Sequence, residues 1–369
     1  MKRSLTTVLC VLLTLSLLLA GCAPGEAPQL TEETARTTEP APTEAPTEAT
    51  EEPTEAPTEP EPRYTNPLTG ESMDAPQERR IVSISIGNTG DAMPTYGLNQ
   101  ADLVFEMYVN HMITRLMAMY TDPTDVPAIG SIRSHRYLFT DLAISYDTIA
   151  AHAGGSHIVM RDANRSGVDH MNIDTGSSTY YSFRDGSRYH SGYLWEHCLF
   201  ANGAGLYELA QSKGYSTDFD RTKDYGLKFA EDEALTEGET ANTVTLTFQL
   251  SGHSKKTVMN FNPETGLYEF TQYNRAMVDG NTGENVSFRN VFVILANTWT
   301  DGDAYQISDI VGTGDGFFAC DGYMIPIRWV RRQEGDVFTF TLEDGTPLLQ
   351  GVGRSYLAIA PLLSTVTAE

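Results

Sequence analysis

The chain has 369 residues and a formal net charge of −24 at neutral pH. The length is enough for two domains. The acidity excludes proteins that hold nucleic acid or anionic lipid through a basic surface, since residues 63–369 alone carry a net charge of −16.

Residues 1–22 have the pattern of a lipoprotein signal peptide. Lys2 and Arg3 precede an apolar run, and Leu19-Ala20-Gly21-Cys22 then matches a lipobox. We expect acyl chains on Cys22, palmitate among them, to anchor the protein in the outer leaflet of the bacterial cytoplasmic membrane, facing outward. The alternative is a plain secretory signal with a chance cysteine.

Residues 23–62 are a low-complexity segment. They contain eleven Glu, nine Pro and no aromatic residue. A segment of this composition cannot bury a core, so the sequence predicts a disordered linker.

The first half of the remaining chain alternates predicted strands and helices. The predicted strands are 80–86, 103–109 and 113–120, the last two joined by a hairpin turn at 110–112. Residues 204–213 are predicted to be a helix that Gly214 ends.

The stretch 128–157 is the most informative part of this half. It predicts a strand at 128–132, a helix at 137–146 and a buried strand at 148–151. A polar turn follows each strand, and Ser156 is a suitable N-cap for a further helix. If the two strands are parallel neighbours joined by a right-handed crossover, both turns face one concavity that suits an anion.

From about residue 226 the pattern becomes β-rich. Strands are predicted at 243–250, 257–261, 267–270, 291–295, 337–342 and 356–360, and the glycine-rich VGTGDGFF at 311–318 is predicted to be a β-turn. We therefore expect an α+β protein, with an N-terminal mixed α/β domain at 63–225 and a smaller β-rich domain at 226–369.

Arginine supplies the strongest candidate site residues. Arg115, Arg133 and Arg136 each border an apolar run of an otherwise acidic chain. A guanidinium group binds carboxylate or phosphate through two hydrogen bonds, but the arginines could instead pair internally with Glu106 or Asp102. Glu106 is then either a general base or the partner of an arginine.

The histidines and cysteines do not form a recognisable metal-binding or disulfide pattern. Seven of the eight histidines lie between residues 111 and 197, but no familiar zinc spacing occurs, so we expect no metal and no cofactor. Cys198 and Cys320 could form a disulfide or stay as two buried thiols.

Several phrases of the chain together carry a family resemblance. They are Asn66-Pro67-Leu68-Thr69-Gly70, Ala101-Asp102, Phe105-Glu106, Thr114-Arg115, Ile132-Arg133-Ser134, His152-Ala153-Gly154-Gly155-Ser156, His190 with Tyr193, Thr265-Gly266-Leu267-Tyr268, Asp279-Gly280-Asn281-Thr282-Gly283-Glu284, Val311-Gly312-Thr313-Gly314, Asp321-Gly322 and Trp329. Over residues 66–361 they resemble the YerB-type family of bacterial lipoproteins. The resemblance implies N- and C-terminal domains and no settled activity, and Ser131, His135 and Ser191 depart from the family pattern.

Two functional hypotheses follow. In the first, the protein binds a polar or anionic ligand of the cell wall or envelope in a cleft of the N-terminal domain. The candidate ligand-binding residues are Glu106, Arg115, Arg133, Arg136, His152, Gly154, Gly155 and His190. In the second, it hydrolyses an envelope glycan or phosphodiester, with His152, His190 and Glu106 as acid–base groups and the arginines as an anion clamp.

Overall fold

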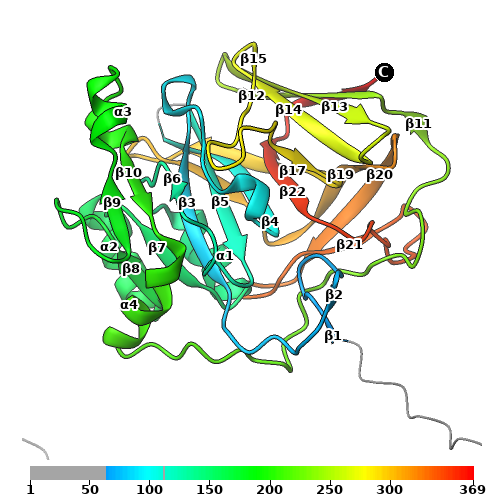
Figure 1. Ribbon diagram of the computed structural model, residues 1–369. Coiled ribbons are helices and arrows are strands. Elements are labelled where there is room, and N and C mark those ends of the chain that lie inside the picture. The colour runs from blue at the N-terminus through cyan, green and yellow to red at the C-terminus, as the bar shows by residue number, and fades with distance from the viewer. Residues whose placement is uncertain (1–63, 111–112) are drawn as a thin grey trace, which may run out of the picture. The chain divides into compact units, whose positions relative to one another are not determined.

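The computed structural model describes residues 64–110 and 113–369 (Figure 1). The signal peptide, Cys22, the linker at 23–62 and the hairpin residues 111–112 lie outside the described residues. Among the described residues, no helix has both the length and the apolar character to cross a membrane.

A mixed sheet of twelve strands is the larger of the two main sheets in this part of the chain. Its main path runs through β11 (Glu239–Thr240), β20 (Tyr323–Arg331), β19 (Gly312–Cys320), β17 (Asn290–Thr300), β22 (Ser355–Pro361), β4 (Leu103–Asn110), β5 (Ile113–Tyr120), β3 (Val82–Asn88), β7 (Ile149–His152) and β8 (His170–Asn172). In addition, β18 (Gln306–Asp309) pairs with β17, and β21 (Thr339–Thr341) pairs with β20.

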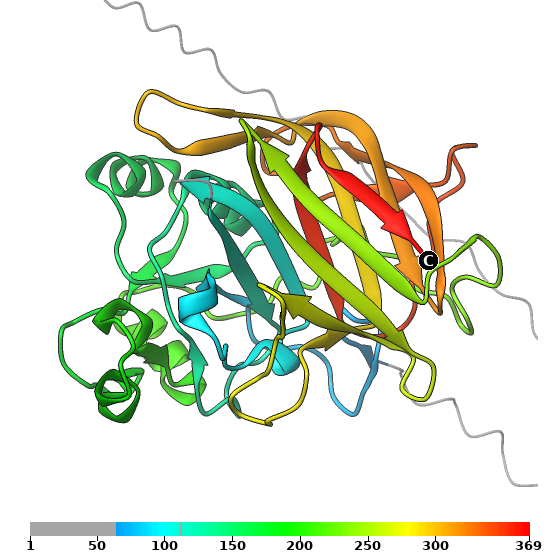
Figure 2. The same cartoon turned by 90° about the horizontal axis from the view of Figure 1, so that it is seen from above.

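The second main sheet has six antiparallel strands and lies across the larger one (Figure 2). It contains β15 (Arg275–Ala276), β14 (Leu267–Gln272), β13 (His253–Asn262), β12 (Thr243–Leu250), β23 (Thr365–Ala368) and β16 (Ser287–Phe288). Two small sheets join β1 (Tyr64–Thr65) to β2 (Ser72–Met73), and β6 (Ile129–Gly130) to β10 (Leu199–Ala201) and β9 (Ser182–Arg184).

The central strand β4 is buried on both faces, which explains its nearly continuous apolar sequence. Val104 and Tyr108 enter a core cluster shared with the six-stranded sheet. Phe105 and Met107 enter a second cluster on the opposite face. Because side chains alternate along a strand, Glu106 points to the same face as Val104 and Tyr108.

The helices of the described residues are short, and they include the three that the sequence predicts. They are α1 (Tyr137–Ser145), α2 (His157–Ser166), α3 (Gly186–His190) and α4 (Leu206–Ser212), with 3-10 turns at Gly90–Ala92, Leu98–Gln100, Trp195–His197 and Gly203–Gly205. Helix α1 packs its apolar residues on the second core cluster. The predicted cap is present, since the Ser156 hydroxyl accepts a hydrogen bond of 3.4 Å from the Val159 amide.

The mostly β content modifies the expected fold class. An α+β description holds in the coarse sense, but the first half is not built from alternating strands and helices of similar weight. The β4–β22 pairing also places strands of both halves in one sheet. The domain division at residues 225 and 226 therefore stays a prediction.

Two local predictions are wrong. The glycine-rich stretch at 311–318 is not a turn but most of β19. Glycine is needed there because a Cβ at Gly314 would lie 2.5 Å from the Trp329 ring, and one at Gly316 would lie 2.6 Å from the Val293 carbonyl oxygen. The strands at 128–132 and 148–151 are also not parallel neighbours, since β6 pairs antiparallel with β10 and β7 pairs with β3 and β8.

Candidate arginine site

Three arginines gather at the end of β3. Arg115 lies on β5 opposite Gly87 of β3, and its Nη1 donates a 2.7 Å hydrogen bond to the carbonyl oxygen of Ser134. Arg133 leaves the segment before α1, where its amide donates to the Ser85 carbonyl oxygen at 2.8 Å. A Cβ at Gly87 would lie 3.0 Å from the Arg133 side chain, so glycine leaves room for it.

Arg136 extends the cluster toward the β17–β18 hairpin. Its Nε and Nη2 donate to the Asn110 side-chain oxygen at 3.2 and 2.9 Å, and its Nη1 donates to the His135 carbonyl oxygen at 2.6 Å. The guanidinium lies 5.5 Å from the centre of the Tyr305 ring. All these partners are neutral, so they orient Arg136 without balancing its charge.

A single carboxylate pairs with the cluster among the described residues. Glu196 Oε1 lies 2.9 Å from Arg133 Nη1, and 57% of the Glu196 side chain is exposed. Neither Arg115 nor Arg136, whose residues are 3% and 7% exposed, forms an ion pair within the described part of the chain. The alternative of internal pairing with Glu106 or Asp102 is therefore wrong for these two arginines.

Burial and mutual repulsion weaken the affinity of the cluster for its protons. Burial, followed by the charges of Arg136 and Arg133, lowers the pKa of Arg115 well below its ordinary value. Burial is also the main cause that lowers the pKa of Arg136 to about 10. A bound anion would oppose the lowering of both pKa values, because it would place a negative charge beside the guanidinium groups.

The glycine turn lies beside the arginine segment, although the strands before the two turns are not neighbours. The Ala153 amide donates to the Arg133 carbonyl oxygen at 3.0 Å, and the His135 amide donates to the Gly154 carbonyl oxygen at 2.8 Å. The Gly154 amide, however, donates to the Asn172 side chain at 3.0 Å. A Cβ at Gly155 would lie 2.7 Å from the Met160 sulfur, so Gly155 permits close packing against α2.

Three histidine rings lie close together next to this segment. The rings of His135 and His152 lie 4.9 Å apart, and those of His152 and His170 lie 5.2 Å apart. A hydrogen bond of 3.0 Å joins His152 Nε2 to His170 Nδ1. Burial and the neighbouring His170 lower the pKa of His152 to about 3, and burial is also the main cause that lowers the pKa of His135 and of His170. Among residues 64–110 and 113–369, no group of three or more His, Cys, Asp or Glu residues could hold a metal ion.

Glu106 does not belong to the arginine cluster. It is fully buried and forms an ion pair with Lys255 of β13. Its second oxygen accepts hydrogen bonds from Gln272 at 3.1 Å and Tyr356 at 2.7 Å. Burial lowers the pKa of Lys255, and the Glu106 carboxylate opposes that shift.

His190 lies apart from the other candidates in its contacts. It ends α3, is exposed, and makes a ring contact with Tyr189 at 5.8 Å. No described contact joins it to His152, which is buried on β7. Both cysteines of the described residues, Cys198 and Cys320, are buried free thiols.

Sequence reasoning missed the neutral and basic partners of the candidates. Lys255 could have been found, because strand alternation places it on the same face as Thr257 and Met259, which are buried. Asn110 and Tyr305 gave no such signal, since their contact with Arg136 depends on two hairpins far apart in the sequence.

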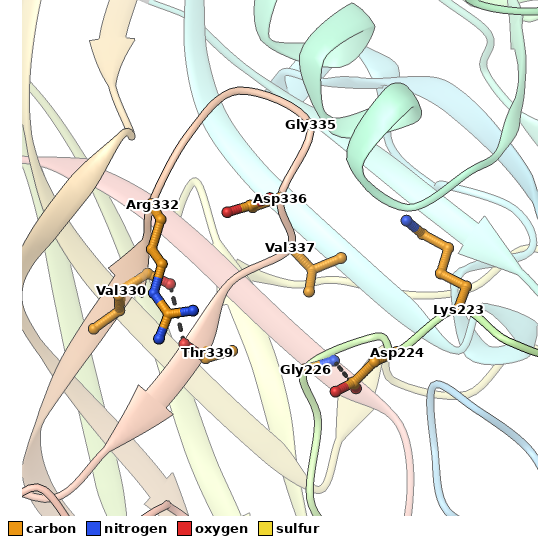
Figure 3. A pocket seen from close by; sticks show the side chains of 9 residues that line it. All are labelled: Lys223, Asp224, Gly226, Val330, Arg332, Gly335, Asp336, Val337 and Thr339. Carbon is orange, nitrogen blue, oxygen red and sulfur yellow. Dashed lines mark hydrogen bonds between the residues drawn. The ribbon is translucent and has the colours of Figure 1, made fainter.

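None of the predicted ligand-binding residues lines any of five pockets in the described part of the chain. One pocket of about 300 Å³ lies between the Lys223–Gly226 segment and the residues around β21. Figure 3 shows Lys223 and Arg332 on opposite sides of it, but none of the predicted site residues lines it. Another, of about 370 Å³, is lined by Ser191 and Tyr193, which follow His190.

Comparisons with known proteins identify the family to which the chain belongs. Residues 68–216 match the model described as the N-terminal domain of a protein of unknown function (DUF3048), and residues 244–357 match its C-terminal domain. The chain belongs to the YerB-type family. It is 25% identical over 305 residues to YerB of Bacillus subtilis (strain 168), whose name describes it as a lipoprotein, with 82% of this chain and 87% of that protein covered.

The fold is shared with a solved YerB structure. The crystal structure of the Bacillus subtilis YerB protein matches with a TM-score of 0.70 and 23% identity, and the match covers 82% of this chain and 99% of that one. The likeness extends over both halves of the YerB-type chain.

Some family-like phrases of this YerB-type chain have structural roles. The Asn66 side chain donates to Asp102 at 2.8 Å, and Asp102 accepts the Thr121 amide at 2.7 Å. Asp279, from the second half, accepts the amides of Gly97 at 3.2 Å and Asn99 at 2.8 Å in the first. These contacts tie turns together and do not contribute to the arginine cluster.

Proposed function

We propose that this chain is a lipid-anchored, extracytoplasmic protein that binds an anionic group of a cell-envelope ligand at Arg115, Arg133 and Arg136. The observation that carries the proposal is the burial of Arg115 and Arg136 without a carboxylate partner among the described residues. A buried charge is costly unless it is paired, so a site of this kind is expected to take up an anion.

The solvent exposure of the three arginine side chains indicates the direction from which a ligand group reaches them. Arg133 is the most open of the three, with 17% of its side chain exposed, whereas Arg115 is nearly enclosed. We therefore expect a single phosphate, sulfate or carboxylate group to approach over Arg133. Guanidinium groups bind such oxygens through paired, charge-assisted hydrogen bonds.

The hydrolase alternative has no comparable support. Its carboxylate, Glu106, is engaged by Lys255, Gln272 and Tyr356 inside the core. Its two histidines share no described contact. A general base must reach the proton it removes, and an enclosed ion pair does not offer that reach.

Replacing Arg115 with methionine is expected to weaken anion binding at least tenfold, a loss of about 1.4 kcal/mol. The same change removes a repelled buried charge, so the ligand-free protein is expected to keep its stability or gain some. Titration with inorganic phosphate at constant ionic strength, followed by calorimetry and thermal unfolding, measures both effects.

The matched control is Arg161→Met, which removes an exposed arginine paired with Asp162 on α2. This control is expected to bind phosphate like the unchanged protein. Equal phosphate binding by the Arg115 and Arg161 variants would contradict the proposed site. A large loss of stability in Arg115→Met would instead assign Arg115 a structural role.

Replacing Cys22 with serine is expected to move the protein from the membrane fraction to the soluble extracytoplasmic fraction. Serine cannot form the thioether that carries the lipid, and the relationship to a named lipoprotein supports this anchor. Fractionation and acyl-chain labelling measure the change. A Cys22→Ser protein that remains in the membrane fraction would show that the anchor lies elsewhere.

A further inference from the structure

A groove of about 750 Å³ lies between two helices and a hairpin. Helices α1 and α2 supply one side of it, and the β17–β18 hairpin with the Glu334–Gly335 turn supplies the other. Its volume is in the range of ligand-binding clefts, and none of the three site arginines lines it.

The walls of this groove expose large apolar side chains. Trp299 is 45% exposed, Ile144 is 40% exposed and Val311 is 38% exposed. All three line the same groove, together with the apolar Ile307 and Ile310. Exposed apolar surface that is gathered in one concave place is typical of an interaction site, and tryptophan is the residue type that most often dominates such sites.

The charges around this apolar floor are all negative. Four carboxylates line the groove, from Asp141, Asp162, Asp309 and Glu334, and no lysine, arginine or histidine does so. Asp141 pairs with the buried Arg331, and Asp162 pairs with Arg161. Asp309 and Glu334 have no ion-pair partner among the described residues.

Further carboxylates lie near Tyr137, which lines the same groove. The pKa of Tyr137 is raised by burial and then by Asp162, Asp301 and Asp303. The last two carboxylates belong to the turn between β17 and β18. The acidic character therefore extends along the hairpin edge of the groove.

We propose that this groove docks a basic segment of a partner protein, with a leucine or phenylalanine side chain against Trp299 and lysine or arginine side chains at Asp309 and Glu334. The charge of the groove supports this occupant, because complementary charge directs encounter and selects among partners. It also disfavours the acidic residues 23–62 as an occupant, since like charges would face each other. The inference does not depend on the arginine site.

The test is a fluorescence titration of the full chain in a Trp195→Phe background. This change removes the other exposed tryptophan, while Trp329 stays buried. The probes are hexapeptides that combine three or four lysine residues with leucine or phenylalanine, and glutamate replaces lysine in the comparison set. Basic peptides are expected to shift the Trp299 emission saturably, and acidic peptides are not.

Two variants with the same charge change separate the groove from general attraction. The pair Asp309→Asn and Glu334→Gln is expected to weaken binding at least tenfold. The pair Glu231→Gln and Asp232→Asn, at exposed positions that do not line the groove, is expected to leave it within twofold. Equal weakening by both pairs, equal binding of acidic peptides or the absence of saturable binding by any basic peptide would each overturn the proposal.

Discussion

Replacing Glu106 with alanine is expected to lower the free energy of unfolding by about 3–5 kcal/mol, because it leaves the Lys255 ammonium buried without a counter-charge. The Gln272 amide and the Tyr356 hydroxyl also lose their acceptor. Urea unfolding at neutral pH measures the change.

Two controls show that the loss comes from the unpaired charge. The double variant Glu106→Gln with Lys255→Met removes both charges and is expected to recover a large part of the stability. Asp315→Ala breaks an exposed pair with Arg328 and is expected to cost less than about 1 kcal/mol. If Glu106→Ala unfolds like the unchanged protein, Glu106 does not have the structural role assigned here.

Acid is expected to destabilise the fold in part through His152. Its pKa is about 3 in the folded protein, against the ordinary 6.5, because of burial and the neighbouring His170. Between these two values the unfolded chain binds a proton that the folded chain does not. Stability from this residue is therefore complete above pH 6.5 and falls by about 1.4 kcal/mol for each pH unit below it, until about pH 3.

A His152→Gln variant isolates this contribution. Its stability is expected to depend less on pH than that of the unchanged protein between pH 6.5 and 4, with the difference largest at the acid end. His253→Gln, at an exposed position on β13, is the control and is expected to follow the unchanged protein. Chemical unfolding at several pH values gives the comparison. Parallel pH profiles for His152→Gln and the unchanged protein would contradict the expected role.

Many helices and strands could be predicted from the sequence, because short-range patterns of apolar and capping residues specify them. The Thr243–Leu250 alternation produced β12 with alternating burial, and Ser156 capped α2 as its hydroxyl predicts. The apolar runs around residues 110–112 produced the β4 and β5 pair in the same way. Each of these outcomes depends on one short segment or on two segments that are adjacent along the chain.

The pairing of the candidate site residues depends on contacts between residues that are far apart in the sequence. The sequence by itself determined that Arg115, Arg133 and Arg136 stand at the ends of apolar runs, and that Glu106 lies within one. Only the tertiary structure decided which charges are paired, because Lys255 meets Glu106 from a strand about 150 positions later, and Asn110 and Tyr305 meet Arg136 from two hairpins. Ion pairing depends on distance in space, and alternation along one strand specifies only the face to which a side chain points.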